Sequence, residues 1–159
     1  MNNHYSKIEP ALYVISTPIG NMQDISNRSL KMLSLSDYIL CEDTRITSKL
    51  LNFYKIKKKL ISFNVVNEKQ KIHKILEDLK NQKVISLVSD AGTPAISDPG
   101  SNLISECHEL GVQVIPIPGA SAILSAVSVS GFSDNFYFCG FLPKKQTELE
   151  KFLFKTKLV

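Results

Sequence analysis

The stretch VISLVSDAGTPAISDPGSNLISECHELG at residues 84–111 contains a strand, a loop and a helix in succession. Its continuous apolar run at 84–88 predicts a short strand, because strands covered on both faces of a parallel sheet lack alternation. The polar, glycine-containing segment at 89–100 predicts a loop. A helical pattern follows from Ser101, and Gly111 stands where helix ends favour glycine. The stretch therefore predicts one β–α unit of a parallel sheet.

Units of the same kind lie on both sides of it. Further strands are predicted at 12–16 (LYVIS), 38–41 (YILC), 60–63 (LISF) and 112–117 (VQVIPI). Ser26 and Thr44 are suited to cap two helices, and apolar residues at helical spacing predict another at 68–80. Together these units predict an open parallel sheet with helices on both faces, a doubly wound α/β domain at 1–117. Pro116 predicts that the last strand ends there or lies at a sheet edge.

The pattern changes after residue 117. Pro118-Gly119 interrupts it, a helix of small residues follows, and the segment from 136 onward is rich in phenylalanine and then in charge. About 40 residues are too few to build a separate α/β core. We expect residues 118–159 to be the beginning of a second α/β domain that this chain does not complete, as in a fragment or one half of a split protein.

Composition limits the class of protein. The 159 residues are 43% hydrophobic, which favours a globular core over disorder, and the net charge of +4 permits a polyanionic partner without requiring one. No apolar run approaches the ~20 residues of a membrane span, and the N-terminus lacks the apolar core of a signal peptide, so we expect a cytoplasmic protein without membrane association. The spacing of the three cysteines excludes a disulfide framework and a zinc knuckle and predicts buried thiols: Cys41, Cys107 and Cys139. We expect no metal site.

Four polar loops directly follow predicted strands, at 17–21, 42–45, 89–100 and 118–122. The carboxyl ends of parallel strands meet at one edge of the sheet, so these loops predict a single ligand site there. No GxxxxGK[ST] or GxGxxG motif is present to hold phosphates. The loops instead carry carboxylates, which can accept hydrogen bonds from ribose hydroxyls and tolerate a sulfonium cation: Glu42, Asp43, Asp90 and Asp98. A nucleoside that is uncharged or cationic fits this set best, although each acid also suits a helix cap or turn.

The same loops resemble a known family. TPIGN at 17–21, CEDTR at 41–45, VSDAGTPAISDPG at 88–100, PIPGASA at 116–122 and GFLP at 140–143 occur in this order. They are similar to the bacterial small-subunit rRNA 2′-O-ribose methyltransferases of the I type, in the tetrapyrrole methylase superfamily. That resemblance implies two domains with S-adenosylmethionine (S-adenosyl-L-methionine) bound between them. It also implies a cytidine of 16S rRNA in the small ribosomal subunit as the methyl acceptor, and it is compatible with a homodimer.

The resemblance also implies roles for individual residues. The cofactor-binding set comprises Pro18, Gly20, Ser89, Asp90, Gly92, Thr93, Pro94, Pro118, Gly119, Ala120 and Ser121. A ribose hydroxyl is a poor nucleophile, so a base would assist, and Glu42 and Asp43 are the candidates. Arg45 is a candidate to hold a backbone phosphate or to pair with these carboxylates, and a helix-surface ion pair is an equally good reading of it.

The chain departs from the family pattern in two places. A YHEHNE-like stretch is usual after the third strand, whereas this chain reads FNVVNE at 63–68, with Asn64-Val65-Val66 in place of the His-containing part. PGAS at 118–121 replaces PGPS. Two alternative functions stay open. The first is a tetrapyrrole-precursor methyltransferase, which is disfavoured because such members resemble GxGPGD where this chain has TPIGN. The second is a cofactor- or RNA-binding remnant without turnover. An incomplete second domain would leave one wall of the cleft missing and impair methyl transfer.

Overall fold

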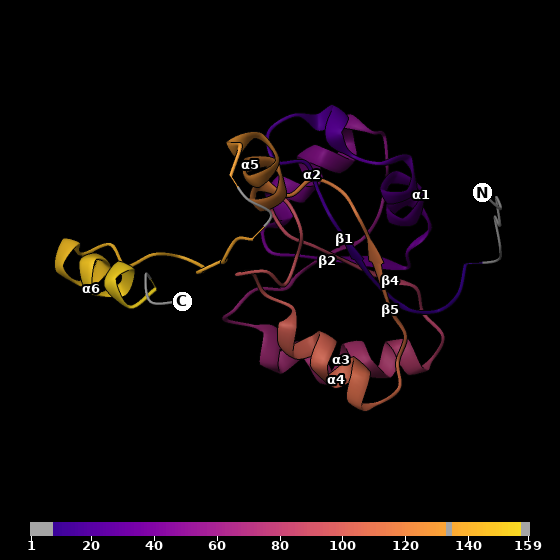
Figure 1. The fold of residues 1–159 in the computed structure, drawn as a ribbon. Coiled ribbons are helices and arrows are strands. Elements are labelled where there is room, and N and C mark those ends of the chain that lie inside the picture. The colour runs from indigo at the N-terminus through magenta and orange to yellow at the C-terminus, as the bar shows by residue number, and fades with distance from the viewer. Residues whose placement is uncertain (1–7, 133–134, 157–159) are drawn as a thin grey trace.

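A computed structural model describes residues 8–132 and 135–156, and its centre is a five-stranded parallel sheet (Figure 1). The strands lie in the order β3-β2-β4-β1-β5, and every neighbouring pair is parallel. Their bounds are β1 Leu12–Ile15, β2 Tyr38–Cys41, β3 Leu60–Ser62, β4 Ile85–Val88 and β5 Val114–Ile117. The predicted α/β fold is therefore confirmed, with each predicted strand in place to within two residues at its ends.

Helices cover both faces of the sheet. One face lies under α1 (Asn27–Leu35) and α2 (Thr44–Phe53), the other under α3 (Glu68–Lys80) and α4 (Ser101–Glu109) (Figure 1). Successive strand residues point to opposite faces, so Ile39 belongs to the α1–α2 core and Leu40 to the α3–α4 core. Both side chains are fully buried. The two apolar layers hold the carboxyl edge of the sheet rigidly in place.

Local signals explain most helix ends, with one correction. Ser26 Oγ accepts the backbone N–H of Ser29 at 3.0 Å, as its capping role predicts. The prediction that Thr44 caps α2 is wrong, because Thr44 is the first helical residue and Asp43 is the cap, accepting the Arg45 N–H at 2.8 Å. The Asp43 carboxylate reaches that N–H while the Asp43 backbone has the extended conformation typical of a cap residue. Gly111 follows α4 with φ +66°, the left-handed conformation expected there.

Strand β5 lies at the edge of the sheet, as Pro116 predicts. Pro116 stands opposite Val14 of β1, its neighbour on one side. On the outer side of an edge strand the missing proline N–H leaves no sheet partner unsatisfied. The chain leaves the sheet after Ile117.

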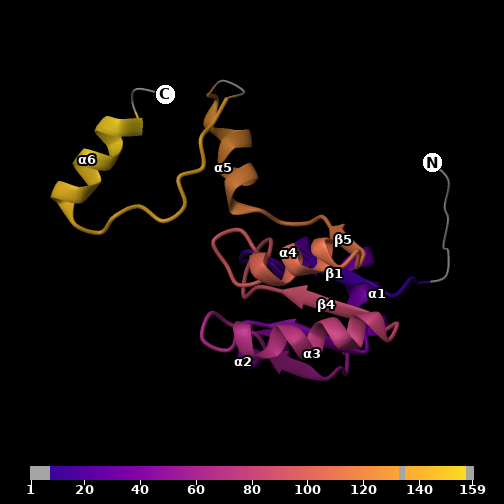
Figure 2. The ribbon, with the colours of Figure 1, turned by 90° about the horizontal axis from the view of Figure 1, so that it is seen from below.

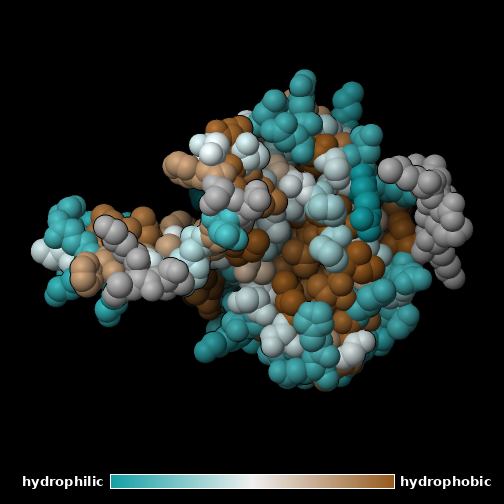
Figure 3. Space-filling model, viewed as in Figure 1, coloured by the Kyte–Doolittle hydropathy of each residue, from teal (hydrophilic) through white to brown (hydrophobic). Residues whose placement is uncertain are grey.

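Residues 118–156 pack differently from the sheet. They contain α5 (Ala122–Ser130) and then α6 (Gln146–Thr156), which projects away from the sheet (Figure 2). A short 3-10 helix lies elsewhere, at Met22–Asp24 after β1. Both α5 and α6 are described in full, and none of their side chains is buried. Hydrophobic side chains are visible at the surface over α5 and along α6 (Figure 3). No strand occurs among the described residues beyond 117, so the second α/β domain stays a prediction.

Two of the three predicted buried thiols, Cys41 and Cys107, lie in the core, whereas Cys139 is half-buried outside the sheet. Burial raises the pKa of Cys107 to about 11, which keeps this thiol protonated at neutral pH. Across the described part of the chain, every helix is too short or too polar to cross a membrane.

Candidate functional site

The first and third polar loops are joined by backbone hydrogen bonds at the carboxyl edge of the sheet. The Thr17 N–H donates to the Gly92 carbonyl at 2.9 Å, and the Gly92 N–H donates to the Thr17 carbonyl at 3.1 Å. The Thr17 hydroxyl also donates to the Ser89 carbonyl at 3.2 Å. Gly92 has φ +82°, a conformation that L side chains rarely adopt, so glycine suits this contact. The pairing fixes the two loops as one wall.

The fourth loop joins this wall through hydroxyl groups. The Ser16 and Thr93 hydroxyls lie 2.9 Å apart, and the Thr93 hydroxyl donates to the Ala120 carbonyl at 3.5 Å. Gly119 lies so close to the first strand that a Cβ atom there would be 2.9 Å from the Ser16 Cβ. Because real Cβ atoms do not approach this closely, glycine is required at 119 for the loop to reach its position.

The second loop completes the cluster through Asp90. The Asp43 backbone N–H donates to Asp90 Oδ1 at 3.1 Å, which connects the start of α2 to the loop after β4. All four polar loops predicted from the sequence are therefore brought together, as parallel strand ends require.

A group of carboxylates gives this edge its electrostatic character. Burial raises the pKa of Glu42, and the neighbouring charges of Asp90, Asp98 and Asp43 raise it further. Burial likewise raises the pKa of Asp98, with Asp90 adding to the rise. Negative charges held close together in a partly desolvated site favour a proton or a cationic ligand. The site is thus better suited to a cationic nucleoside than to a phosphate.

Asp43 differs from Glu42 because it is paired. Arg45 Nε donates to Asp43 Oδ1 at 3.0 Å and to Oδ2 at 3.1 Å, and its Nη2 lies 2.5 Å from Oδ2. These hydrogen bonds lower the pKa of Asp43 to about 2. A carboxylate with so low a pKa is a poor proton acceptor near neutrality. Of the two candidate bases, Glu42 therefore has the more suitable electrostatics. The Arg45 side chain is 87% exposed, so its outer face stays available to a further anion.

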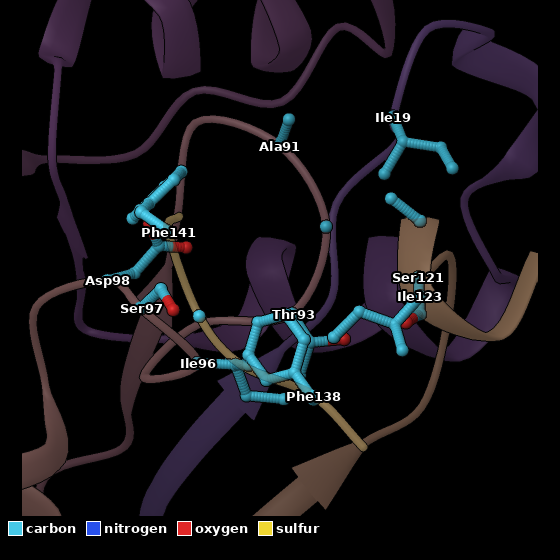
Figure 4. Close-up of a pocket in the computed structure, with 13 residues that line it drawn as sticks. Ile19, Ala91, Thr93, Ile96, Ser97, Asp98, Ser121, Ile123, Phe138 and Phe141 are labelled. Carbon is cyan, nitrogen blue, oxygen red and sulfur yellow. The ribbon is translucent and has the colours of Figure 1, made fainter. Parts of the chain in front are cut away.

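Two cavities open at this edge of the sheet. We call the first the α5-side cavity; it measures about 260 Å³, and Figure 4 shows Ile19, Ser121 and Ile123 on one side of it and Phe141, Asp98 and Ser97 on the other. Its remaining lining is Ala91, Gly92, Thr93, Ile96, Ala122, Phe138 and Gly140. The residues that line this cavity come from segments far apart in sequence, which is typical of a ligand pocket.

The second, which we call the α2-side cavity, measures about 320 Å³ and adjoins α2. Its lining comprises Thr17, Pro18, Ile19, Gly20, Met22, Ile46, Thr47, Leu50, Ser89, Asp90 and Ala91. Ile19 and Ala91 line both cavities. The two cavities are thus neighbours with a thin shared wall.

The structure divides the predicted cofactor-binding residues between these cavities. Gly92, Thr93 and Ser121 line the α5-side cavity. The α2-side cavity is lined by Pro18, Gly20, Ser89 and Asp90 of the predicted set. Within the described residues, neither lining includes the other predicted cofactor-binding residues, Pro94, Pro118, Gly119 and Ala120. In the same part of the chain, neither lining includes the catalytic candidates Glu42, Asp43 and Arg45. The Asp43 backbone N–H does, however, donate to the lining residue Asp90.

Sequence reasoning missed the apolar part of both linings. The linings include four apolar residues that the sequence analysis does not identify as site residues: Ile96, Phe138, Ile46 and Leu50. An apolar side chain in a pocket has the same sequence signature as one in a core. Ile19, Ile96 and Phe141 did carry a signal, because they belong to the stretches TPIGN, VSDAGTPAISDPG and GFLP.

A buried carboxylate outside the cavities holds the loop after β4 from behind. Glu68, at the start of α3, accepts the Gly100 N–H at 3.2 Å and the Asn102 side-chain amide at 3.5 Å. Gly100, and not an acid of the preceding loop, is the cap residue of α4, and its N–H is satisfied by Glu68. Gly100 has φ +122° and packs tightly on Leu87, which leaves no room for a capping side chain there.

The stretch that departs from the family pattern lies at the surface. Val65 and Val66 are 77% and 89% exposed. The backbone N–H of Asn64 donates to the side-chain oxygen of Asn67, and the backbone N–H of Asn67 donates to the side-chain oxygen of Asn64. The side-chain amide of Asn67 also donates to the Ser62 hydroxyl. Among the residues that the structure describes, no group of three or more His, Cys, Asp or Glu side chains is arranged to hold a metal ion.

An open parallel sheet with a pocketed, carboxylate-bearing edge defines the class of α/β proteins that bind a ligand beyond their strand ends. The chain belongs to the tetrapyrrole (corrin/porphyrin) methylases, whose family model matches residues 11–142. That span includes all four polar loops, both cavities and α5.

Curated relatives agree with the resemblance seen in the sequence. A Thermotoga maritima protein named ribosomal RNA small subunit methyltransferase I is 54% identical over 134 residues, covering 84% of this chain and 60% of the relative. Proteins of the same name from Mesomycoplasma conjunctivae and Haemophilus influenzae are 50% and 49% identical, covering 87% and 84% of this chain and 58% and 48% of the relatives. The chain thus spans about half the length of the curated relatives it matches. The predicted resemblance is confirmed.

Solved structures confirm the fold alone. A diphthine synthase matches with a TM-score of 0.61 at 20% identity, covering 77% of this chain and 49% of that chain. A uroporphyrin-III-C-methyltransferase from Thermus thermophilus matches with a TM-score of 0.59 at 15% identity, covering 80% and 54%.

Proposed function

We propose that this chain carries the S-adenosylmethionine site of an enzyme that methylates the 2′-hydroxyl of a cytidine in 16S rRNA. The observation that supports it most is the 54% identity, over 134 residues or 84% of this chain, to a relative named for small-subunit rRNA methylation. A tetrapyrrole-precursor substrate has no comparable support, because solved structures named for such methyltransferases share only 15–17% identity with this chain.

The α5-side cavity suits the cofactor. Its apolar side chains, Ile96, Phe138 and Phe141, offer a surface for an adenine ring, and Ser97 and Ser121 offer hydroxyls. Asp98 supplies a carboxylate that can accept from ribose hydroxyls or balance a sulfonium. The donor and acceptor types therefore fit S-adenosylmethionine.

When bound, S-adenosylmethionine supplies an activated methyl group: the sulfur–methyl bond breaks, the oxygen–methyl bond forms, and the electron pair stays on sulfur. The chain must hold the acceptor hydroxyl in line and take up its proton. We assign the proton to the Glu42 carboxylate, whose raised pKa makes it the better base of the two candidates. Such assistance contributes about 10²–10⁴-fold. Orientation of the two ligands contributes more, which is the task of the rigid loops.

Arg45 and Asp43 have a supporting task in this proposal. Asp43 caps α2 and holds the guanidinium through hydrogen bonds to both carboxylate oxygens, which leaves one face of Arg45 exposed. An arginine fixed in this way is suited to a backbone phosphate of the RNA. A cytoplasmic location follows from a ribosomal substrate.

Residues 118–159 are proposed to begin the second domain that would cover the α5-side cavity. Their exposed apolar side chains, including Phe132, Phe136 and Phe154, support this, because such surfaces mark contacts with other protein parts. A homodimer is a further proposal for the same surface, and sedimentation equilibrium of the chain tests it.

Calorimetry with S-adenosylmethionine, followed by transfer of labelled methyl groups to unmethylated small ribosomal subunits, tests the proposed function. We expect binding by the chain and, once a complete second domain is supplied, transfer that Glu42→Gln reduces at least about 100-fold with cofactor affinity unchanged. Glu77→Gln, on the exposed face of α3, is the matched control. Absence of cofactor binding contradicts the proposal. Binding without transfer, even when a complete relative is active on the same subunits, favours the remnant without turnover.

A further inference from the structure

The α2-side cavity has no ligand assigned to it, although at about 320 Å³ it is similar in size to the α5-side cavity. We propose that it receives the acceptor nucleoside of the RNA, with the base inserted beside α2 and the ribose at the wall shared with the α5-side cavity. This inference rests on the proposed function and adds to it the place where the acceptor binds.

The lining matches an unstacked base. Met22, Ile46 and Leu50 present apolar side chains against which the faces of a base can pack. Enzymes that do chemistry on a base take it out of the stack into such a pocket, and the same movement would bring the attached ribose to this edge of the sheet. A cavity of this size lies at the lower end of the range of about 300–1,000 Å³ typical of small-molecule sites.

Polar groups occupy the inner side of the same cavity. Asp90 and Thr47 line it, and Asp90 Oδ1 already accepts the Asp43 N–H at 3.1 Å. A carboxylate that is anchored through one oxygen can accept a donor, such as an exocyclic amine or a ribose hydroxyl, with the other. These groups recognise donors, as a cytidine presents, and disfavour an inserted phosphate.

The position of the α2-side cavity relative to charged groups supports the same ligand. Ile46, which lines it, directly follows Arg45 on α2, and the Arg45 side chain is mostly exposed. An exposed cation on the helix that lines an apolar pocket can contact the phosphate of a nucleotide at the surface while the base enters. Within the described residues, neither cavity lining includes a Lys or Arg, and each includes one carboxylate, Asp98 or Asp90.

The shared wall brings the two ligands together. Ile19 and Ala91 line both cavities, so the two cavities are neighbours. Methyl transfer requires the acceptor oxygen and the methyl carbon to lie about 3–3.5 Å apart before reaction. Ligands in neighbouring cavities can approach each other in this way, whereas a cofactor that filled both would leave the acceptor outside.

Two matched substitutions test the inference in the 159-residue chain. Ile46 is 42% exposed in the α2-side cavity and Ile96 is 45% exposed in the α5-side cavity, so Ile46→Trp and Ile96→Trp each fill one cavity at a similar cost to folding. The probes are S-adenosylmethionine, by calorimetry, and a decoding-region RNA hairpin with pyrrolocytidine at the target position, whose fluorescence rises on unstacking. Circular dichroism melting checks folding, and Ile46→Phe replaces Ile46→Trp if the latter unfolds.

We expect Ile46→Trp to weaken RNA binding about tenfold or more and to abolish the fluorescence rise, since lost base stacking is worth about 1–3 kcal/mol. Cofactor affinity should stay within about twofold, and Ile96→Trp should give the reverse pattern. Equal loss of cofactor affinity in both variants overturns the inference, because the two cavities then form one cofactor site. Unchanged RNA binding and fluorescence in Ile46→Trp overturn it as well.

Failure of the proposed function gives different results. An unsubstituted chain that binds neither probe contradicts the proposed function itself, and the variants are then not needed. An unsubstituted chain that binds S-adenosylmethionine but not the RNA overturns both the RNA substrate and the acceptor site, while the cofactor assignment survives.

Discussion

Helices α4 and α5 have the same length, nine residues, but opposite environments. In α4, Leu103 and Cys107 are fully buried against the sheet, whereas α5 has no buried residue although most of its side chains are apolar. Full burial of an aliphatic side chain is worth about 1.5–3 kcal/mol, so α4 is stabilised by its contacts and α5 is not. Apolar composition therefore does not by itself make a helix part of the core; a complementary surface must lie opposite it.

The difference extends to the regions around the two helices. Ile117 is the last buried residue among those described, and every described residue from 118 onward is half-buried or exposed. Residues 8–117 form a core with two apolar layers, while residues 118–156 present apolar side chains without covering them. The site lies at the junction, because the α5-side cavity takes part of its lining from each region.

The largest expected effect tests this comparison directly. Leu103→Ala in α4 should lower the free energy of unfolding by about 2–5 kcal/mol, because it leaves a cavity in the α3–α4 core. Leu124→Ala in α5, at a side chain that is 61% exposed, should change it by less than about 0.5 kcal/mol. Urea unfolding measures both. Similar losses in the two variants would show that α5 is packed in solution and that the comparison is wrong.

A second prediction asks whether polar contacts hold the site loop to the packed region. Glu68→Ala should cost about 1–3 kcal/mol, because the buried Gly100 N–H loses its acceptor. Proteolysis at 89–100 should accelerate as that loop loosens. The control is Glu77→Ala on the same helix, where only an exposed ion pair with Lys74 is lost. Equal stability of the two variants would mean that Glu68 does not anchor the loop.

A third, smaller effect concerns the start of α2. Asp43→Ala should lower the midpoint of thermal unfolding by a few degrees, because the Arg45 N–H loses its cap. Asp43→Asn keeps an acceptor oxygen and should lose much less. Thr44→Ala is the matched control, since the structure gives Thr44 no capping hydrogen bond. If Thr44→Ala is the more damaging change, the cap predicted from the sequence is the correct one.

These contacts also show which parts of the fold the sequence could predict. Helix α3 was predicted at 68–80 and β2 at 38–41, both with the bounds that the structure has, because apolar periodicity and length decide such elements. The loops of the site were predicted as a group from the rule that parallel strand ends meet at one edge.

What the sequence could not predict depends on contacts between distant residues. The shift of the α2 cap from Thr44 to Asp43 depends on which side chain reaches an N–H, and both residue types are good caps. The anchoring of Gly100 by Glu68 joins positions 32 residues apart. The predicted cofactor residues are divided between two cavities that share Ile19 and Ala91, and no pattern in the sequence predicts that these two residues lie between two cavities.

The smallest expected effect is a pH-dependent one at Glu42. Its pKa is raised in the folded protein, by burial first and then by the charges of Asp90, Asp98 and Asp43, so folding favours the protonated form. Below the pKa of about 4.3 that glutamate has in the unfolded chain, the carboxyl is protonated in both the folded and the unfolded state, so its charge does not lower the free energy of unfolding. As the pH rises through the folded pKa, the charged group makes the folded state less stable.

Glu42→Gln should therefore raise the free energy of unfolding at pH 7 and leave it unchanged near pH 3, as measured by urea unfolding at both values. Glu77→Gln gives the reference for loss of an exposed carboxylate. A gain of equal size at both pH values would trace the effect to side-chain packing and not to charge. A loss at pH 7 would mean that the Glu42 carboxylate is stabilised by a partner in the folded state, and Glu42 would then be a poor candidate for the base. The expected gain, combined with loss of methyl transfer in the same variant, is the pattern of a group that sacrifices stability for activity.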